Sequence, residues 1–233
     1  MFRSLIPSPY SLLPFLGYNQ PMIRHVLFDL DGTLYSVNYG LDDNCFHRIQ
    51  EFAASVLGMS LEECEPLRGK ALKRYGTTLE WLCAEKGFTA IDDYFAFIHP
   101  DDEADDLPPN PELRQFLLNL PCPCSVLTNS PRFHAERVIK KIELEGVFQN
   151  IFDIASNGLK GKPHGSAFRA ALDILGLDAE EALFVDDYPR YVQGYILIGG
   201  KGLLLDENDV HKNYPYEKIK DLREITRFLD GTP

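Results

Sequence analysis

The chain has 233 residues, of which 45% are hydrophobic and 25% charged, a composition typical of a soluble globular protein with a sizeable core. Its net charge of −12 repels polyanions, so we expect no binding to a nucleic-acid polymer or an anionic membrane. A small anionic substrate stays open, because a metal ion or a lysine can reverse the local charge inside a cleft.

The first 21 residues are apolar but contain four prolines, which fits a secretory signal poorly and a membrane helix worse. We expect residues 1–21 to be a weakly ordered extension, with Met22 as a candidate natural start before the first strand. The five cysteines show no C-x-x-C spacing. They predict reduced thiols in a cytoplasmic protein, in preference to a disulfide framework or a zinc site.

The predicted elements begin with a short buried strand over residues 25–28, which is followed by a long helical stretch. Ser60 and Glu63 have the spacing of a capping box, and Pro66 is expected to break or kink the helix that they open. No strand is predicted between residues 42 and 99. Apolar residues at helical spacing predict helices over 42–58, 60–76, 78–87 and 89–100.

The next stretch, "DDEADDLPPNP" at residues 101–111, contains five acids followed by three prolines. This composition suits neither a helix interior nor a strand. We therefore predict a solvated linker, at which an inserted helical module returns to the main domain.

Beyond the linker, short apolar strands alternate with helices. The strands are predicted at 124–128, 151–155, 182–186 and 202–206, and the helices at 111–119, 131–146, 165–176, 189–200 and 216–229. Continuously apolar strands in this alternation predict an α/β fold with a Rossmann-like, doubly wound parallel sheet that is covered on both faces.

Polar residues stand where several of these strands end, and the carboxyl ends of the strands are where doubly wound sheets bind ligands. Each residue alone is ordinary for a turn, but together they predict one cleft. The residues are Asp29 and Asp31, Thr128, Asn129 and Ser130, Lys160 and Lys162, and Asp186 and Asp187.

The spacing of Asp29 and Asp31 directs both carboxylates to the same side while the chain stays extended. Burying two unpaired carboxylates together is costly, and a hard divalent cation relieves that cost. Asp186 and Asp187 supply further oxygen ligands. Oxygen ligands without clustered histidine or cysteine favour Mg²⁺ over zinc.

In their order along the chain, "FDLDGTLY" (28–35), "VLTNS" (126–130), "GKPH" (161–164) and "FVDD" (184–187) resemble the motifs of the haloacid dehalogenase (HAD) superfamily. The resemblance extends from Met22 to the end of the chain. It implies a Rossmann-like core made of residues 22–35 and 108–233. It also implies an inserted α-helical C1 cap at 36–107, as in subfamily IA, which would close over the cleft.

The resemblance implies a phosphomonoester hydrolase in which Asp29 attacks phosphorus and forms an aspartyl-phosphate. Asp31 would protonate the departing alkoxide and then deprotonate the water that hydrolyses the intermediate. Asp29, the backbone carbonyl of Asp31, and Asp186 or Asp187 would hold Mg²⁺.

The same resemblance assigns the phosphoryl group to Thr128 and Lys162, with Asn129 as a further substrate-binding residue. Lys162 is preferred to Lys160 because it directly precedes Pro163, as in the "KPH" pattern of the family.

Within the superfamily, "DGTLY", "KPHGSAF" and "VDDYPRYV" look most like the branch that contains pyrimidine 5'-nucleotidases, and imply a pyrimidine nucleoside 5'-monophosphate as substrate. Arg190 and Tyr191 depart from the common pattern of the family, in which smaller or amide residues are frequent at these positions. The aromatic residues Tyr75, Trp81, Tyr94, Phe95 and Phe97 are interpreted as the small core of the cap, and His47, His99, His134 and His164 are assigned no chemistry.

Several alternatives stay open. A sugar-phosphate or phosphoglycolate phosphatase would share the mechanism, whereas a 2-haloacid dehalogenase would lack an acid at the position of Asp31. A phospho-accepting receiver domain carries its acid pair earlier in a shorter chain, and a non-catalytic binding protein would be expected to miss a motif residue. The physiological substrate, the oligomeric state and the choice between Asp186 and Asp187 cannot be read from the sequence.

Overall fold

The computed structural model describes residues 22–229, so the prediction for residues 1–21 lies outside the described part of the chain. None of the helices between Met22 and Leu229 combines the length and the apolar character needed to cross a bilayer.

The centre of the fold is a parallel sheet with the strand order β3-β2-β1-β4-β5-β6. The strands are β1 His25–Phe28, β2 Cys124–Leu127, β3 Ile151–Phe152, β4 Ala182–Asp186, β5 Lys201–Leu205 and β6 Lys218–Ile219. After β1, the strands β2 and β3 are added on one side of it, and β4, β5 and β6 on the other. The topological switch point therefore lies between β1 and β4. The predicted Rossmann-like, doubly wound α/β fold is confirmed.

The alternation of side chains along β1 explains why both faces of the sheet are covered. Val26 and Phe28 point into one apolar cluster, while Leu27 between them points into another. The parallel register extends this pattern to the neighbouring strands, because Phe28 is paired with Val126 and Val185. Each face of the sheet therefore carries a continuous apolar surface that helices must bury.

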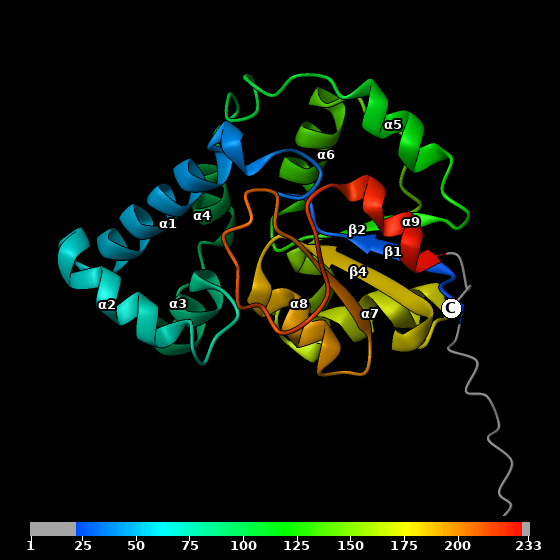
Figure 1. The fold of residues 1–233 in the computed structure, drawn as a ribbon. Coiled ribbons are helices and arrows are strands. Elements are labelled where there is room, and N and C mark those ends of the chain that lie inside the picture. Colours follow the sequence, from blue (N-terminus) through cyan, green and yellow to red (C-terminus); the bar gives the residue numbers. More distant parts are fainter. Residues whose placement is uncertain (1–21, 230–233) are drawn as a thin grey trace, which may run out of the picture.

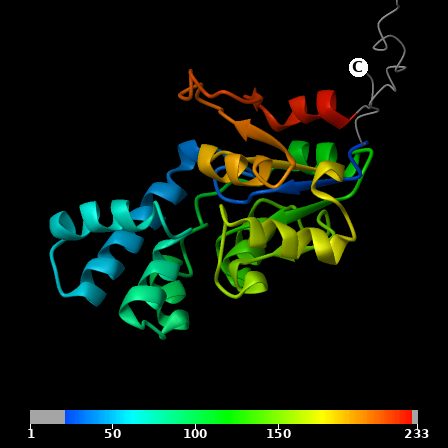
Figure 2. The same ribbon diagram turned by 90° about the horizontal axis from the view of Figure 1, so that it is seen from below.

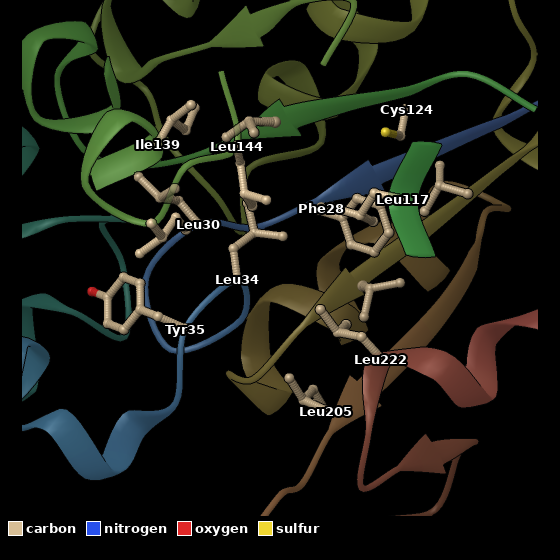
Figure 3. Packing of buried hydrophobic residues seen from close by; sticks show 14 of the residues in the cluster. Phe28, Leu30, Leu34, Tyr35, Leu117, Cys124, Ile139, Leu144, Leu205 and Leu222 are labelled. Atoms are coloured by element: carbon tan, nitrogen blue, oxygen red, sulfur yellow. The ribbon is translucent and has the colours of Figure 1, made fainter. Parts of the chain in front are cut away.

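Five helices cover these two surfaces (Figure 1). On one side lie α5 Pro111–Leu118, α6 Arg132–Lys141 and α9 Thr226–Leu229, and on the other α7 Gly165–Leu175 and α8 Pro189–Ile196. The close view shows Phe28, Leu117 and Cys124 among the residues of the cluster on the first side, with the Tyr35 ring at the edge of the cluster and its hydroxyl directed away from it (Figure 3).

The segment between β1 and α5 is helical and contains no strand, as predicted for residues 42–99. Its helices are α1 Leu41–Leu57, α2 Leu61–Ala71, α3 Thr78–Lys86 and α4 Ile91–Ile98. They stand beside the sheet in both ribbon views (Figure 1, Figure 2). Trp81 belongs to an apolar cluster within this helical unit, Tyr94 belongs to a cluster that also contains Ile154 from the segment after β3, and Phe97 is exposed. The division of the chain into core and cap stays a prediction.

Helix α2 contains the predicted capping box, in which Ser60 Oγ accepts from the Glu63 amide and the Glu63 carboxylate accepts from Ser60. Pro66 lies inside the helix without ending it. The helix nevertheless ends at Ala71, five residues before the predicted end at Gly76.

Two predicted elements are wrong. The strand predicted over 151–155 has only two residues, because the Asp153 carboxylate caps a 3-10 helix, η2 Ile154–Asn157, by accepting from the Ser156 amide. The helix predicted over 216–229 is instead strand β6, the 3-10 helix η4 Leu222–Ile225 and the short helix α9. Lys218 and Ile219 pair with β5 and therefore join the sheet as a strand.

The solvated linker predicted over 101–111 is wrong in part. Ala104 and Leu107 are buried in the main core, and the Glu103 side chain is only 1% exposed. Three side chains of this acidic stretch are therefore buried. Two of them are apolar, and the third, Glu103, is an acid whose charge is paired.

Replacement of Phe168 by alanine will lower the free energy of unfolding by about 3–5 kcal/mol. The ring is fully buried between α7 and β4, where it contacts Phe184 and Tyr195, so its loss leaves a cavity. Urea denaturation measures the change. Ile174→Ala on the same helix is the control, since Ile174 is exposed and should change stability by less than about 0.5 kcal/mol. Equal effects of the two substitutions would contradict the packing described above.

Candidate active site

A cavity of about 220 Å³ opens at the carboxyl ends of β1, β2 and β4 and extends toward helices α1 and α4. Its walls come from both the sheet and the helical unit. The cavity lies at the switch point of the sheet, where strand ends and loops diverge and leave room for a ligand.

Lys162 is the charged centre of the cavity floor and is only 1% exposed. Its Nζ atom lies 2.6 Å from Asp29 Oδ1 and 2.6 Å from Asp186 Oδ2. Burial alone would lower the pKa of Lys162, but Asp186 and Asp29 outweigh burial and raise it. The lysine therefore stays protonated and presents a positive charge beside Asp29. Lys160, by contrast, is exposed.

Asn129 fixes the backbone of Lys162. Its Nδ2 donates to the Lys162 carbonyl at 3.0 Å, and its Oδ1 accepts from the Lys162 amide at 2.7 Å. A Cβ atom at Gly161 would lie 2.2 Å from Asn129 Oδ1, so only glycine fits there. Thr128 is buried and its Oγ1 accepts from the Ser130 amide at 3.0 Å. Direct contact of Asn129 or Thr128 with a substrate stays a prediction.

Asp29, Asp186 and Asp187 form an oxygen-only cluster in which the potential ligand atoms all lie within 4.8 Å of one another. Burial and the negative charge of Asp186 raise the pKa of Asp29 despite Lys162. Burial and Asp186 likewise raise the pKa of Asp187 to about 8. Carboxylates that are held together against their own repulsion form a donor set that suits a hard divalent cation.

Two further residues crowd this cluster. Gly32 has a left-handed φ of 72°, and a Cβ atom there would lie 2.6 Å from Asp187 and 2.9 Å from Asp42. Asp42 comes from the first turn of α1, and burial together with Asp31 raises its pKa to about 7. Asp42 was not predicted as a site residue, because nothing near it in the sequence marks it.

Asp31 lies in a different environment from Asp29. Its Oδ1 accepts from the Tyr35 hydroxyl at 2.8 Å and lies 2.7 Å from His134 Nε2, while its Oδ2 accepts from Ser130 Oγ at 2.7 Å. Burial raises the pKa of Asp31, but His134 and the donated hydrogen bonds prevail and lower it below its ordinary value. The two acids of the opening motif thus have different partners.

His134 joins Asp31 to Glu103, since its Nδ1 lies 2.5 Å from Glu103 Oε1. Burial would lower the pKa of His134, but Asp31 and Glu103 raise it to about 10. The sequence analysis assigned no chemistry to His134 and treated Glu103 as part of a solvated linker. The only sequence signal was that His134 follows the "TNS" motif by one helical turn.

One wall of the cavity is largely apolar and comes from the helical unit. Phe46, Leu72, Tyr94 and Phe95 line it, together with Arg68. This wall joins the loops of the sheet through polar contacts, in which Arg190 donates to the Tyr75 carbonyl at 3.2 Å and His164 lies 2.8 Å from Glu80. The Tyr191 ring centre lies 5.0 Å from Lys162 Nζ. Aromatic and apolar groups thus line the same cavity as the acids and the lysine at the strand ends.

Known proteins resemble this chain over most of its length. It is 27% identical over 197 residues to a phosphoglycolate phosphatase of Rhodospirillum rubrum, covering 73% of this chain and 74% of the relative. It is 24% identical over 217 residues to the pyrophosphatase PpaX of Bacillus mycoides, covering 90% of this chain and 99% of the relative. These relatives are phosphohydrolases by name.

The fold resembles the crystal structure of a HAD phosphatase from Thermococcus onnurineus, with a TM-score of 0.59 at 19% identity, over 90% of this chain and 99% of that one. A family model described as a haloacid dehalogenase-like hydrolase matches residues 23–194. The superfamily predicted from the four motifs is confirmed, whereas subfamily IA, the C1 cap and the nucleotidase branch stay predictions. The chain belongs to the haloacid dehalogenase-like hydrolase family.

Proposed function

We propose that this protein is a Mg²⁺-dependent phosphomonoester hydrolase that acts through an aspartyl-phosphate on Asp29. The observation that supports this most strongly is the pairing of Asp29 with Lys162 at 2.6 Å, at the floor of the cavity. A carboxylate nucleophile needs a nearby cation to receive a phosphoryl group, because two anions must approach each other. Lys162 provides such a charge.

In the first step, a carboxylate oxygen of Asp29 attacks phosphorus and the bond from phosphorus to the ester oxygen breaks. Asp31 donates a proton to the departing oxygen, so that an alcohol leaves in place of an alkoxide. The dianionic phosphoryl group raises the proton affinity of Asp31 as it approaches, since like charges disfavour ionisation. Lys162 and Thr128 bind the phosphoryl oxygens during the transfer.

In the second step, Asp31 accepts a proton from a water molecule as that water attacks the phosphorus of the aspartyl-phosphate. The bond between phosphorus and the Asp29 oxygen breaks, which releases inorganic phosphate and restores the carboxylate. One residue thus acts first as acid and then as base, and the reaction is divided into two easier displacements.

Asp29, the backbone carbonyl of Asp31, Asp186 and Asp187 are the residues that would hold Mg²⁺. The crowding of three carboxylates within 4.8 Å supports this assignment. When bound, the ion would supply positive charge that screens these acids and the phosphate from each other.

For the substrate we propose a pyrimidine nucleoside 5'-monophosphate, with UMP and CMP as first candidates. The apolar and aromatic residues that the helical unit contributes to the cavity support a leaving group with a flat apolar surface. The name of the Rhodospirillum relative favours a smaller organic phosphate such as phosphoglycolate as the second candidate. The presence of Asp31 speaks against a dehalogenase. The presence of Asp29, Thr128 and Lys162 in the lining of one cavity speaks against a non-catalytic binding protein.

We also propose that the protein is cytoplasmic and that the only partner its reaction requires is a small-molecule substrate. The net charge of −12 and the five unpaired cysteines support both parts of that proposal.

Asp29→Asn should abolish Mg²⁺-dependent phosphate release, with a loss of at least about 10³-fold, because an amide oxygen is a poor nucleophile. Release of inorganic phosphate from phosphomonoesters measures it. Addition of a chelator should silence the wild type, and excess Mg²⁺ should restore it. Phosphate release that survives both the substitution and the chelator would refute the proposed mechanism.

Lys162→Met should lower kcat/KM by about 10²–10³-fold, since the variant loses the cation beside the nucleophile. Lys160→Met is the matched control, because Lys160 is two residues away and exposed, and its activity should stay within about threefold of the wild type. Circular dichroism checks that both variants are folded. The opposite ranking would assign the phosphoryl contact to Lys160.

A phosphate-release screen over UMP, CMP, purine nucleotides, phosphoglycolate and sugar phosphates should show selective turnover of the pyrimidine nucleotides. The reason is the apolar wall of the cavity, which would accept a planar base. Strong use of a sugar phosphate with no response to UMP or CMP would overturn the substrate assignment and leave the mechanism intact.

A further inference from the structure

His134 is a buried imidazole that is clamped between two carboxylates. It belongs to the first turn of α6 and is 1% exposed. Its Nε2 lies 2.7 Å from Asp31 Oδ1, and its Nδ1 lies 2.5 Å from Glu103 Oε1. Both ring nitrogens are therefore engaged, and the ring cannot turn without breaking a hydrogen bond in a buried environment.

The far partner, Glu103, is itself held in place. Its Oε2 lies 3.0 Å from His99 Nδ1, and its Oε1 accepts from Arg137 Nη1 at 2.9 Å. Arg137 follows His134 by one helical turn on α6 and also donates to the carbonyls of His99 and Pro100. Glu103 thus acts as a fixed support for the imidazole and not as a mobile surface acid.

His99, Glu103 and His134 also have potential metal-ligand atoms within 4.8 Å of one another. Two contacts argue against a cation among them. Arg137 already brings a positive charge to Glu103, and His134 Nε2 is directed at Asp31. The three side chains are therefore better explained as a hydrogen-bonded network than as a second metal centre.

The Asp31 carboxylate is the group that this network reaches. Tyr35 and Ser130 also donate to it, but both are hydroxyl groups that can rotate toward other acceptors. Tyr35 has such an alternative, because its hydroxyl lies 3.1 Å from Asp42 Oδ1. His134 is the partner whose own position is fixed on both sides.

We propose that His134 is a positioning residue for Asp31, which holds that carboxylate in the orientation needed to exchange a proton with the ester oxygen, while Glu103 fixes the imidazole. The inference rests on the proposed phosphatase function. A proton-transfer group that is turned from its working orientation loses rate, since the transfer depends on hydrogen-bond geometry. His134 acts through Asp31 and is not itself a catalytic residue.

The test compares two ester types at saturating Mg²⁺. An alkyl ester, either UMP or phosphoglycolate, needs a proton on its departing oxygen, whereas para-nitrophenyl phosphate leaves as a stable phenolate and needs little protonation. In His134→Gln, kcat/KM for the alkyl ester should fall by about 10- to 100-fold, while kcat/KM for the aryl ester should change by less than about threefold. Asp31→Asn should show the same selectivity with a larger loss.

Glu103→Gln, which weakens the support without removing the imidazole, should give the same selectivity with a smaller loss. If circular dichroism shows that His134→Gln does not fold, Glu103→Gln serves as the test of the proposal. His47→Gln makes the same chemical change on the exposed face of α1 and should leave both ester types at wild-type rates. These variants separate an effect on Asp31 from a general effect of losing a histidine.

Equal losses on the two ester types, or wild-type rates on the alkyl ester in the folded variants, would overturn the role of His134. A wild-type protein that hydrolyses neither ester with Mg²⁺ would instead refute the proposed function. The two failures are therefore distinguishable in a single set of assays.

Discussion

The concentration of buried negative charge at the end of β1 is the constraint on which the rest of the site depends. Asp29, Asp186 and Asp187 are held within 4.8 Å of one another, and Lys162 is the cation that the chain places among them. Burial of like charges is unfavourable unless a counter-charge is fixed nearby. The fold meets this requirement with the hydrogen bonds between Asn129 and the Lys162 backbone, and with a glycine at position 161 that lets Asn129 approach.

The same site separates two acids that are neighbours in the sequence. Asp29 is paired with Lys162, whereas Asp31 is held by His134, Ser130 and Tyr35. A pair of carboxylates can serve as nucleophile and as acid–base only if their environments differ. The environment of Asp31 is built from the loops after β1 and β2 and from α6, and through His134 it includes Glu103 of the segment after α4.

The sheet and most residues of the candidate site could be predicted from the local sequence pattern. The strands carry unbroken apolar residues and the strand ends carry acids, a hydroxyl group and a lysine, so the sheet and the gathering of its end residues follow from topology. The partners of Asp31 could not be found in this way, because His134 and Glu103 are 103 and 72 residues away from it. The stretch over 216–229 was predicted as a helix because its spacing is helical, but β5 offers an open edge and pairing with β6 prevailed.

The sequence by itself determined the alternation of strands and helices, the acids and lysine at the strand ends, and through them the family. These features are local, since each depends on a few adjacent residues whose polarity and spacing are read directly. Only the tertiary structure decided which histidine meets Asp31, how Asn129 holds Lys162, and that Glu103 is buried and not solvated. Those outcomes depend on the packing of α6 against the linker and on the loops at the sheet edge, and contacts between distant segments leave no periodic trace in the chain.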